Sequence, residues 1–186
     1  HNEIKADLFI PCGGRPDTIN SSNWRKYFSE DGIPSARIIV EGANLFVSAN
    51  ARRELEHEDI LFVYGPSANK TGVICSSYEV LGGMIMSEEE FLADKDRYVA
   101  EVLDILRQRA RAEARLLINT HKACGGCRAL PNISLDLSRE INAIGDSFYS
   151  LLLEQGVTLE EDETLRDLFY AYCPGLLVEK YKDRLL

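Results

Sequence analysis

Three short, nearly continuous apolar runs mark the first part of the chain, at Ala6–Ile10, Arg37–Val40 and Ile60–Tyr64. Because they do not alternate with polar residues, they are typical of parallel strands covered by helices on both faces. Ser48 or Asn50 can cap a helix over residues 51–58, and a short helix is expected over Asp17–Glu30. Residues 5–86 therefore predict an α/β architecture, a partial Rossmann-like parallel sheet of about three strands.

From Ser87 onward the pattern changes to a helical period, and no strand pattern follows. Ser87 and Glu90 form a capping box for a long helix that reaches about Ile118. Three more helices are expected: Ser134–Gln155, stopped by Gly156; one capped by Thr158 and Glu161 that ends before Pro174; and Gly175–Leu185. The break at residues 83–87 predicts two domains, a sheet-bearing part at 1–86 and an all-helical tail at 87–186.

A loop of small and polar residues follows each apolar run: PCGGRPDTIN at 11–20, EGANLF at 41–46 and PSANKTGVICSSYEV at 66–80. Small residues let a ligand approach the backbone, while amide and hydroxyl groups hydrogen-bond a flat polar ligand. In open parallel sheets, ligands bind just outside the carboxyl ends of the strands. The three loops therefore predict one shared site at that edge, where Glu41 either holds its loop or faces solvent.

The same loops carry a family resemblance. DLFIPCGGRPDTIN, IIVEGANLF, ARRELE and SANKTGVICSSYEV, in this order, resemble the nicotinamide-binding domain of glutamate dehydrogenases, and GGRP is similar to the large NAD-specific subclass. The resemblance covers about residues 6–82 and adds nothing specific beyond them. It implies that residues 1–86 are the carboxyl-terminal half of a dinucleotide-binding domain. The implied reaction oxidises L-glutamate to 2-oxoglutarate and ammonia, with hydride transfer to NAD.

The resemblance also implies roles for individual residues. Ser76 would hold the side-chain carboxylate of glutamate, with Val73 against its methylene groups, and a helix that begins near Val73 would favour that negative charge. Asn44 and Asn69 would contact the nicotinamide end of the cofactor or the substrate. Four residues would lie along the nicotinamide ribose: Pro11, Cys12, Gly13 and Gly14. Without the neighbouring segments that resemble the family, these residues would be interpreted as ordinary turn and helix-start residues.

The chain opens at His1 without a methionine, and no GxGxxG motif occurs. If the resemblance holds, the pyrophosphate-binding half and the catalytic lysines and aspartate of the family precede this piece. We therefore expect no catalytic residue in this fragment and no turnover by the fragment alone. The choice between NAD and NADP depends on an upstream acidic residue. Leucine- and phenylalanine-type dehydrogenases share the domain plan, but the Ser76 hydroxyl favours a substrate with a carboxylate at its distal end.

Composition restricts the partners. The 186 residues carry a formal charge of −9 and show no basic stripe, which argues against nucleic acid. No apolar run approaches the ~20 residues that span a bilayer, so no membrane contact is expected. Five cysteines, an odd number, suit a reducing compartment. We expect a soluble, cytoplasmic protein whose partners are a small-molecule substrate and, in the full-length enzyme, further copies of itself.

Two other interpretations remain open. The helical tail can be a non-catalytic interaction or oligomerisation module. Cys124 and Cys127, preceded by His121, can instead form a metal or thiol module. A tetrahedral zinc needs four ligands, and no second pair stands at ligand spacing, so no metal is expected. A redox pair usually lies beside a strand, whereas this motif ends a helix, which favours a plain glycine turn between helices.

Overall fold

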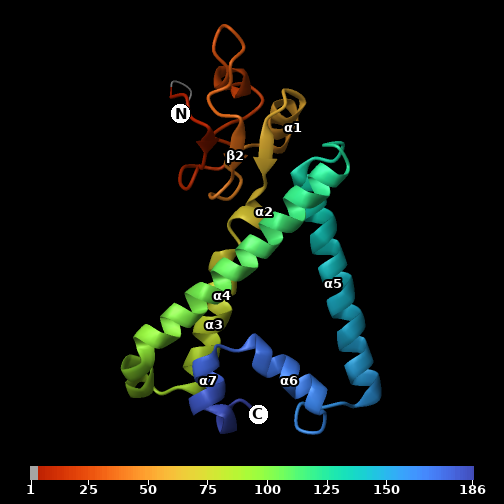
Figure 1. Ribbon diagram of the computed structural model, residues 1–186. Coiled ribbons are helices and arrows are strands. Elements are labelled where there is room, and N and C mark those ends of the chain that lie inside the picture. Colours follow the sequence, from red (N-terminus) through yellow and green to blue (C-terminus); the bar gives the residue numbers. More distant parts are fainter. Residues whose placement is uncertain (1–3) are drawn as a thin grey trace. The chain divides into compact units, whose positions relative to one another are not determined.

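The computed structural model describes residues 4–186 and contains the predicted parallel sheet. The strands β1 (Leu8–Phe9), β2 (Ile38–Val40) and β3 (Leu61–Val63) are hydrogen-bonded in the order β1-β2-β3 (Figure 1). The central strand is buried at its middle residue, because Ile39 is fully inaccessible to solvent. Each strand is shorter than its apolar run, but all three runs form strands, which confirms the predicted fold class.

The described residues group into two compact units. The first unit contains the residues through Lys70 together with Glu113–Ser138, and the second contains Thr71–Ala112 together with Arg139–Leu186. Two long helices, α4 (Glu88–Ala123) and α5 (Leu130–Gln155), contribute one segment to each unit. The domain boundary that the sequence indicates near residue 87 falls between α3 (Thr71–Ile85) and α4, and it stays a prediction.

The first unit packs around the sheet. Helix α1 (Ala49–His57) begins at Ser48, whose hydroxyl accepts a hydrogen bond from Ala51 N at 3.3 Å, as predicted. The helix buries Ala51 and Leu55 against the sheet core. The same core holds aromatic and aliphatic residues from all parts of the unit up to β3: Ile19, Tyr27, Ile39, Phe46 and Phe62.

The prediction of a helix over residues 17–30 is wrong in its extent. Only a 3-10 turn, η1 (Trp24–Tyr27), forms there. Asn23 explains the difference, because its side chain accepts a hydrogen bond from Asn20 N at 2.8 Å and donates one to Thr18 O at 2.9 Å. Such local side-chain bonds compete with helical hydrogen bonds. The segment is a hydrogen-bonded loop, and Ile19 forms an isolated parallel bridge with Val47.

Segments of the two long helices cover β3 within the first unit. Leu117 of α4 and Leu130 and Ile133 of α5 form a buried cluster. Leu61 and Val63 of β3 pack against this cluster. The helical tail therefore supplies part of the covering layer that a buried parallel strand requires.

The second unit has its own helical core, formed by α3, α6 (Glu163–Tyr172), α7 (Gly175–Lys180) and the first part of α4, with η2 (Lys182–Arg184) at its end. Gly82 lets α3 approach α4 closely, because a Cβ there would lie 2.9 Å from the Tyr98 hydroxyl. That hydroxyl donates a hydrogen bond to Tyr78 O at 2.5 Å. Leu176 and Leu177 of α7 complete the core without any solvent exposure.

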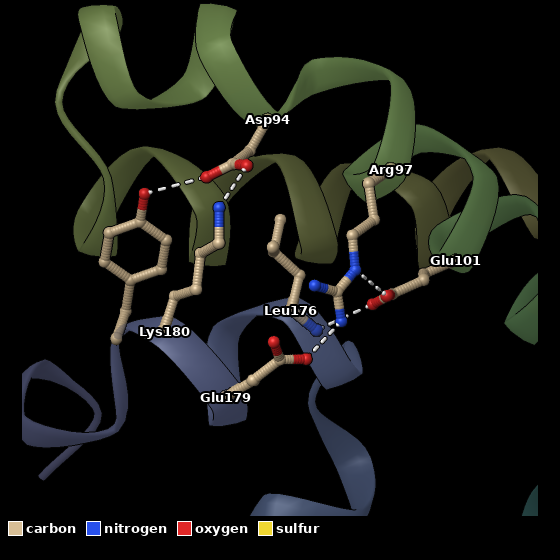
Figure 2. Close-up of polar contacts among 7 residues, drawn as sticks. Asp94, Arg97, Glu101, Leu176, Glu179 and Lys180 are labelled. Carbon is tan, nitrogen blue, oxygen red and sulfur yellow. Dashed lines mark hydrogen bonds and ion pairs between the residues drawn. The ribbon is translucent and has the colours of Figure 1, made fainter.

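Polar contacts attach α7 to α4, as Figure 2 shows. Pro174, the residue before α7, provides no side-chain cap. Glu101 of α4 takes this role and accepts a hydrogen bond from Leu176 N at 2.8 Å (Figure 2). At the other end of α7, Lys180 donates to Asp94 at 2.6 Å. The amino end of this short helix is therefore capped by a neighbouring helix.

The helix boundaries test the predicted caps. The capping box at Ser87 is confirmed, because Glu90 N donates to its hydroxyl at 3.2 Å and Ser87 N donates to the Glu90 carboxylate at 2.8 Å. The cap expected at Thr158 is wrong: Asp162 caps α6 by accepting from Leu165 N at 2.7 Å. Among the helices of residues 4–186, none has the length and apolar character to span a membrane.

Candidate functional site

The first and second loops meet at the carboxyl edge of the sheet. Ala43 N, after β2, donates a hydrogen bond to Pro11 O, after β1, at 2.7 Å. Gly42 makes this approach possible, because a Cβ there would lie 2.8 Å from Cys12 Sγ and 3.2 Å from Pro11 O. Pro11 is buried and Cys12 is exposed. The structure thus brings together two of the three predicted loops.

Glu41 joins the second loop to the third. Its side chain is fully buried, and its two carboxylate oxygens accept hydrogen bonds from Val47 N at 3.0 Å and Gly65 N at 3.1 Å. Gly65 leaves room for this contact, because a Cβ there would lie 3.2 Å from the carboxylate. The structure settles the alternative left open for Glu41, which holds the loops and does not face solvent. A buried carboxylate needs such donors to offset its lost hydration.

Asn44 and Asn69 lie side by side. The Asn69 amide nitrogen donates a hydrogen bond to the Asn44 amide oxygen at 2.6 Å. Asn69 ends the short helix α2 (Gly65–Ala68), and its backbone N–H donates to Gly65 O, which places its side chain toward the second loop. Asn44 is exposed and Asn69 is half-buried. The pair therefore retains an amide donor on Asn44 and a carbonyl acceptor on Asn69 for an incoming ligand.

The two adjacent glycines of the first loop differ in backbone conformation and in the space around them. Gly14 has a φ of +114°, and a Cβ there would lie 2.8 Å from the Phe46 ring, so the fold itself requires glycine. Gly13 has an ordinary φ, and no atom lies within 4 Å of a Cβ placed there. Gly14 is therefore needed for packing, whereas Gly13 borders open space.

Two contacts that the sequence did not reveal support the third loop. Lys70 forms an ion pair with Glu113 of α4, whose carboxylate side chain is only 14% exposed. Ser67 of α2 shares a hydrogen bond with Ser134 of α5 at 2.5 Å. Both partners lie far along the chain in helices whose position the sequence does not indicate. The tail helices therefore hold the loop that carries Asn69.

Val73 and Ser76 lie on α3, in the second unit, and both are exposed. Their neighbour Ser77 donates a hydrogen bond to Ile74 O at 2.7 Å and contacts the Tyr172 hydroxyl at 3.1 Å. In the described part of the chain, the Ser76 hydroxyl forms no comparable bond. The structure thus distinguishes the two serines, while the shared site of Ser76 with Asn44 and Asn69 stays a prediction.

The Cys124 and Cys127 motif forms the turn between α4 and α5, as expected. The helix ends on either side of this turn pack on β3 through Leu117 and Leu130. Within residues 4–186, no group of three or more histidine, cysteine or acidic side chains is placed to hold a metal ion.

Comparisons with known proteins relate this chain to one dehydrogenase family. The model of the Glutamate/Leucine/Phenylalanine/Valine dehydrogenase family matches residues 1–128. Glutamate dehydrogenase 2 of Dictyostelium discoideum is 35% identical over 197 aligned positions, which cover 97% of this chain and 18% of that protein. The NAD-specific glutamate dehydrogenase of Neurospora crassa is 30% identical, with 94% of this chain and 17% of that protein covered.

A probable NAD-specific glutamate dehydrogenase of Schizosaccharomyces pombe is 33% identical, with 81% of this chain and 14% of that protein covered. The chain therefore spans less than a fifth of the length of these curated relatives. The family match over residues 1–128 includes all three loops that follow the strands. This chain belongs to the glutamate/leucine/phenylalanine/valine dehydrogenase family.

Proposed function

We propose that this chain is part of an NAD-dependent glutamate dehydrogenase and supplies the surface that binds the nicotinamide end of NAD. The single observation that carries the proposal is the hydrogen bond between Asn69 and Asn44 at the carboxyl edge of the parallel sheet. Ligands of open α/β sheets bind at this edge. The relatives named as NAD-specific glutamate dehydrogenases support NAD as the cofactor.

The chemistry of the loops suits a nicotinamide group. A carboxamide offers one acceptor and two donors, and the bond between Asn69 and Asn44 leaves the Asn44 amide nitrogen free to donate and the Asn69 amide oxygen free to accept. The open space beside Gly13 suits close approach of a ribose to the backbone of the first loop, which also contains Pro11, Cys12 and Gly14. These groups would bind and orient the cofactor; when bound, NAD supplies the hydride acceptor.

For the substrate, we propose that Ser76 hydrogen-bonds the distal carboxylate of L-glutamate and that Val73 packs on its methylene groups. Ser76 is exposed and unpaired in the described residues, whereas Ser77 is bonded to Ile74 O. Leucine or phenylalanine would leave this hydroxyl unpaired, which costs binding energy. The products would be 2-oxoglutarate and ammonia. Because no residue here is assigned to activate the amine, we expect no turnover by this chain alone.

Titration of the chain with reduced nicotinamide mononucleotide tests the cofactor part. Followed by NMR, the backbone amides of Gly13, Asn44 and Asn69 should shift together. Asn69→Ala should weaken binding about tenfold, in line with about 1.4 kcal/mol for one lost hydrogen bond. Asn142→Ala removes an exposed helical asparagine and should leave the dissociation constant unchanged. Shifts confined to other parts of the chain would contradict the proposal.

Kinetics of the complete dehydrogenase test the substrate part. Ser76→Ala should lower kcat/KM for glutamate by about 10- to 100-fold, the usual loss for a hydrogen bond to a charged group. The KM for NAD should change by less than about twofold. The matched variant Ser77→Ala removes a hydroxyl that is bonded internally and should not change glutamate use. Equal losses for glutamate and NAD would reject the role of Ser76.

A second role, in assembly, is supported by α5. Ile141, Ile144, Phe148 and Leu151 form one apolar stripe, and each is at least 46% exposed. We propose that a second copy of the chain covers it in an antiparallel pair, in which Phe148 fits the open space beside Gly145 of the other copy. Light scattering should show a dimer that Ile144→Glu disrupts and Ser150→Glu, on the opposite helix face, does not. A monomeric parent chain would exclude this pairing.

The proposed location of the enzyme is the cytoplasm. Five cysteines, an odd number without a disulfide framework, suit a reducing compartment. Fractionation of cells that express the complete enzyme tests this location, and recovery of the activity in an organelle would contradict it.

A further inference from the structure

The turn between α4 and α5 brings Cys124 and Cys127 close together along the backbone. Cys127 N donates a hydrogen bond to Cys124 O at 3.2 Å, which closes a tight turn from the first cysteine to the second. In such turns the terminal Cα atoms lie less than about 7 Å apart, within the range that a disulfide can bridge. The Cys124 thiol donates a hydrogen bond to His121 O at 3.2 Å, within the same turn. The backbone of this turn therefore suits a disulfide between the two cysteines.

The glycines between the cysteines make this geometry possible. Gly125 has a φ of +64° and Gly126 a φ of +79°, a conformation that other residues rarely adopt. Additional hydrogen bonds fix the turn: Gly126 N donates to His121 O at 2.9 Å, and a His121 ring nitrogen lies 2.7 Å from Arg128 O. The turn is therefore built from several mutually consistent contacts.

The surroundings of Cys124 favour a reactive thiol. The hydrogen bond from Cys127 lowers the pKa of Cys124 most, and backbone N–H groups of Arg128, Cys127 and Gly126 lower it further. The partner thiol has a raised pKa because it donates this bond. By contrast, burial and the nearby Glu79 raise the pKa of Cys75. The thiolate is the nucleophile in disulfide exchange, so the lowered pKa favours Cys124 over Cys127 as the attacking group.

A pocket gives external molecules access to the turn. It has a volume of about 590 Å³, and one wall contains Gly125, Gly126 and Cys127. The other walls come from the end of α1, including His57, and from the beginning of β3. The candidate nicotinamide loops follow the carboxyl ends of the strands, whereas this pocket lies where β3 begins. It is therefore separate from the proposed cofactor surface.

We propose that Cys124 and Cys127 form a reversible dithiol–disulfide pair that exchanges with low-molecular-weight disulfides. The Cys124 thiolate attacks one sulfur of the incoming disulfide, the bond between its two sulfur atoms breaks, and one small thiolate leaves. Cys127 then loses its proton and attacks Cys124 Sγ, which expels the second small thiolate. Two protein thiols are oxidised to one disulfide, and one small disulfide is reduced to two thiols, which take up the protons released.

The position of the pair gives the exchange a structural consequence. The turn joins the two helix ends that cover β3 through Leu117 and Leu130, and the same helices hold the third loop through Glu113 and Ser134. A covalent link across the turn restricts the separation of these helix ends. Oxidation should therefore slow the hydrogen exchange of β3 amides without changing the fold.

Equilibration with mixtures of reduced and oxidised glutathione tests the proposal directly. After alkylation with iodoacetamide, mass spectrometry should show Cys124 and Cys127 passing together from two alkylated thiols to one internal disulfide. The Cys124 thiol should disappear at least about tenfold faster than the Cys75 thiol. In Cys127→Ser, a mixed disulfide with glutathione should accumulate on Cys124. In Cys124→Ser, the remaining Cys127 should react slowly.

Glycine variants test the geometry without touching the thiols. Gly125→Ala places a side chain at positive φ although the space around it is open, so the internal disulfide should become several-fold less favourable. Gly145→Ala, in the middle of α5, has equal space and an ordinary φ and should leave the exchange unchanged. The proposal is rejected if Cys124 reacts no faster than Cys75, or if the parent chain accumulates only mixed disulfides. Zinc bound stoichiometrically to the pair would reject it as well.

Discussion

The two ends of α5 carry similar apolar residues in opposite environments. Near the start of the helix, Leu130 is 2% and Ile133 is 5% exposed, because β3 and the end of α4 pack against them. Further along, Ile144 is 69% and Leu153 is 65% exposed. An amphipathic period therefore indicates that a helix face needs a partner, but it does not identify the partner or show that the partner lies within the same chain.

The largest expected effect is a difference in stability between substitutions at the two ends of α5. Leu130→Ala should lower the free energy of unfolding by about 3 kcal/mol, because it leaves a cavity in the cluster that covers β3. Ile144→Ala, which removes a similar side chain from an exposed site, should change it by less than about 0.5 kcal/mol. Urea unfolding followed by circular dichroism, at low protein concentration, measures both.

Equal losses of stability in the two variants would contradict the difference in burial between the two ends of α5. A large loss for Ile144→Ala that disappears on dilution would show that another copy of the chain covers the end of α5. A large loss at every concentration would show that the chain itself covers Ile144 in solution.

Much of the fold follows from local patterns. Three continuous apolar runs indicated three parallel strands, and all three form. Hydroxyl and carboxylate groups at the right spacing indicated the caps at Ser48 and Ser87, because capping depends only on neighbouring backbone groups. The sixth helix shows the limit of this argument: Thr158 and Asp162 are both suitable caps, and the sequence does not decide between them.

The candidate site was predictable only in part. Small and amide residues at the strand ends indicated the three loops, and the bond between Asn44 of the second loop and Asn69 of the third fits that expectation. The contacts that hold the third loop could not be predicted from such local patterns. Lys70 pairs with Glu113, and Ser67 pairs with Ser134, and these contacts depend on where α4 and α5 pass the sheet. No local pattern encodes such long-range packing.

Two adjacent glycines of α3 offer a second comparison between a buried and an exposed position. The expected changes in stability are smaller than for Leu130→Ala. Gly82 is buried, and an added Cβ would lie 2.9 Å from the Tyr98 hydroxyl, so Gly82→Ala should destabilise the second unit by about 1–3 kcal/mol. Gly83 is exposed with nothing within 4 Å, so Gly83→Ala should stabilise the helix by about 0.5–1 kcal/mol.

Thermal unfolding of the two variants gives opposite shifts of Tm if Tyr98 packs against α3 in solution. Two upward shifts would show that the ring moves away without cost. Two downward shifts would show that glycine is needed at both positions for another reason, and the contrast between covered and uncovered positions on α3 would not hold.

The smallest expected effect concerns an exposed contact that joins η2 to the start of α4. Arg184 donates two hydrogen bonds to the Glu90 carboxylate, at 2.8 and 2.9 Å. Together with Ser87 N, it lowers the pKa of Glu90 to about 2 from an ordinary value of 4.5. Because the pKa is lowered in the folded state, the stabilisation is complete above the unfolded pKa and is lost as pH falls toward about 2.

Arg184→Gln should therefore lower Tm slightly at neutral pH, and the difference from the parent chain should narrow between about pH 4.5 and 2. Lys182→Gln removes the same charge from the same 3-10 turn, but the Lys182 amine lies over the Tyr170 ring, 4.9 Å from its centroid, and not at the Glu90 carboxylate. Its Tm difference should not follow the titration of Glu90. A constant difference for Arg184→Gln down to the lowest pH would show that Arg184 acts through its bond to Ile85 O and not through the carboxylate.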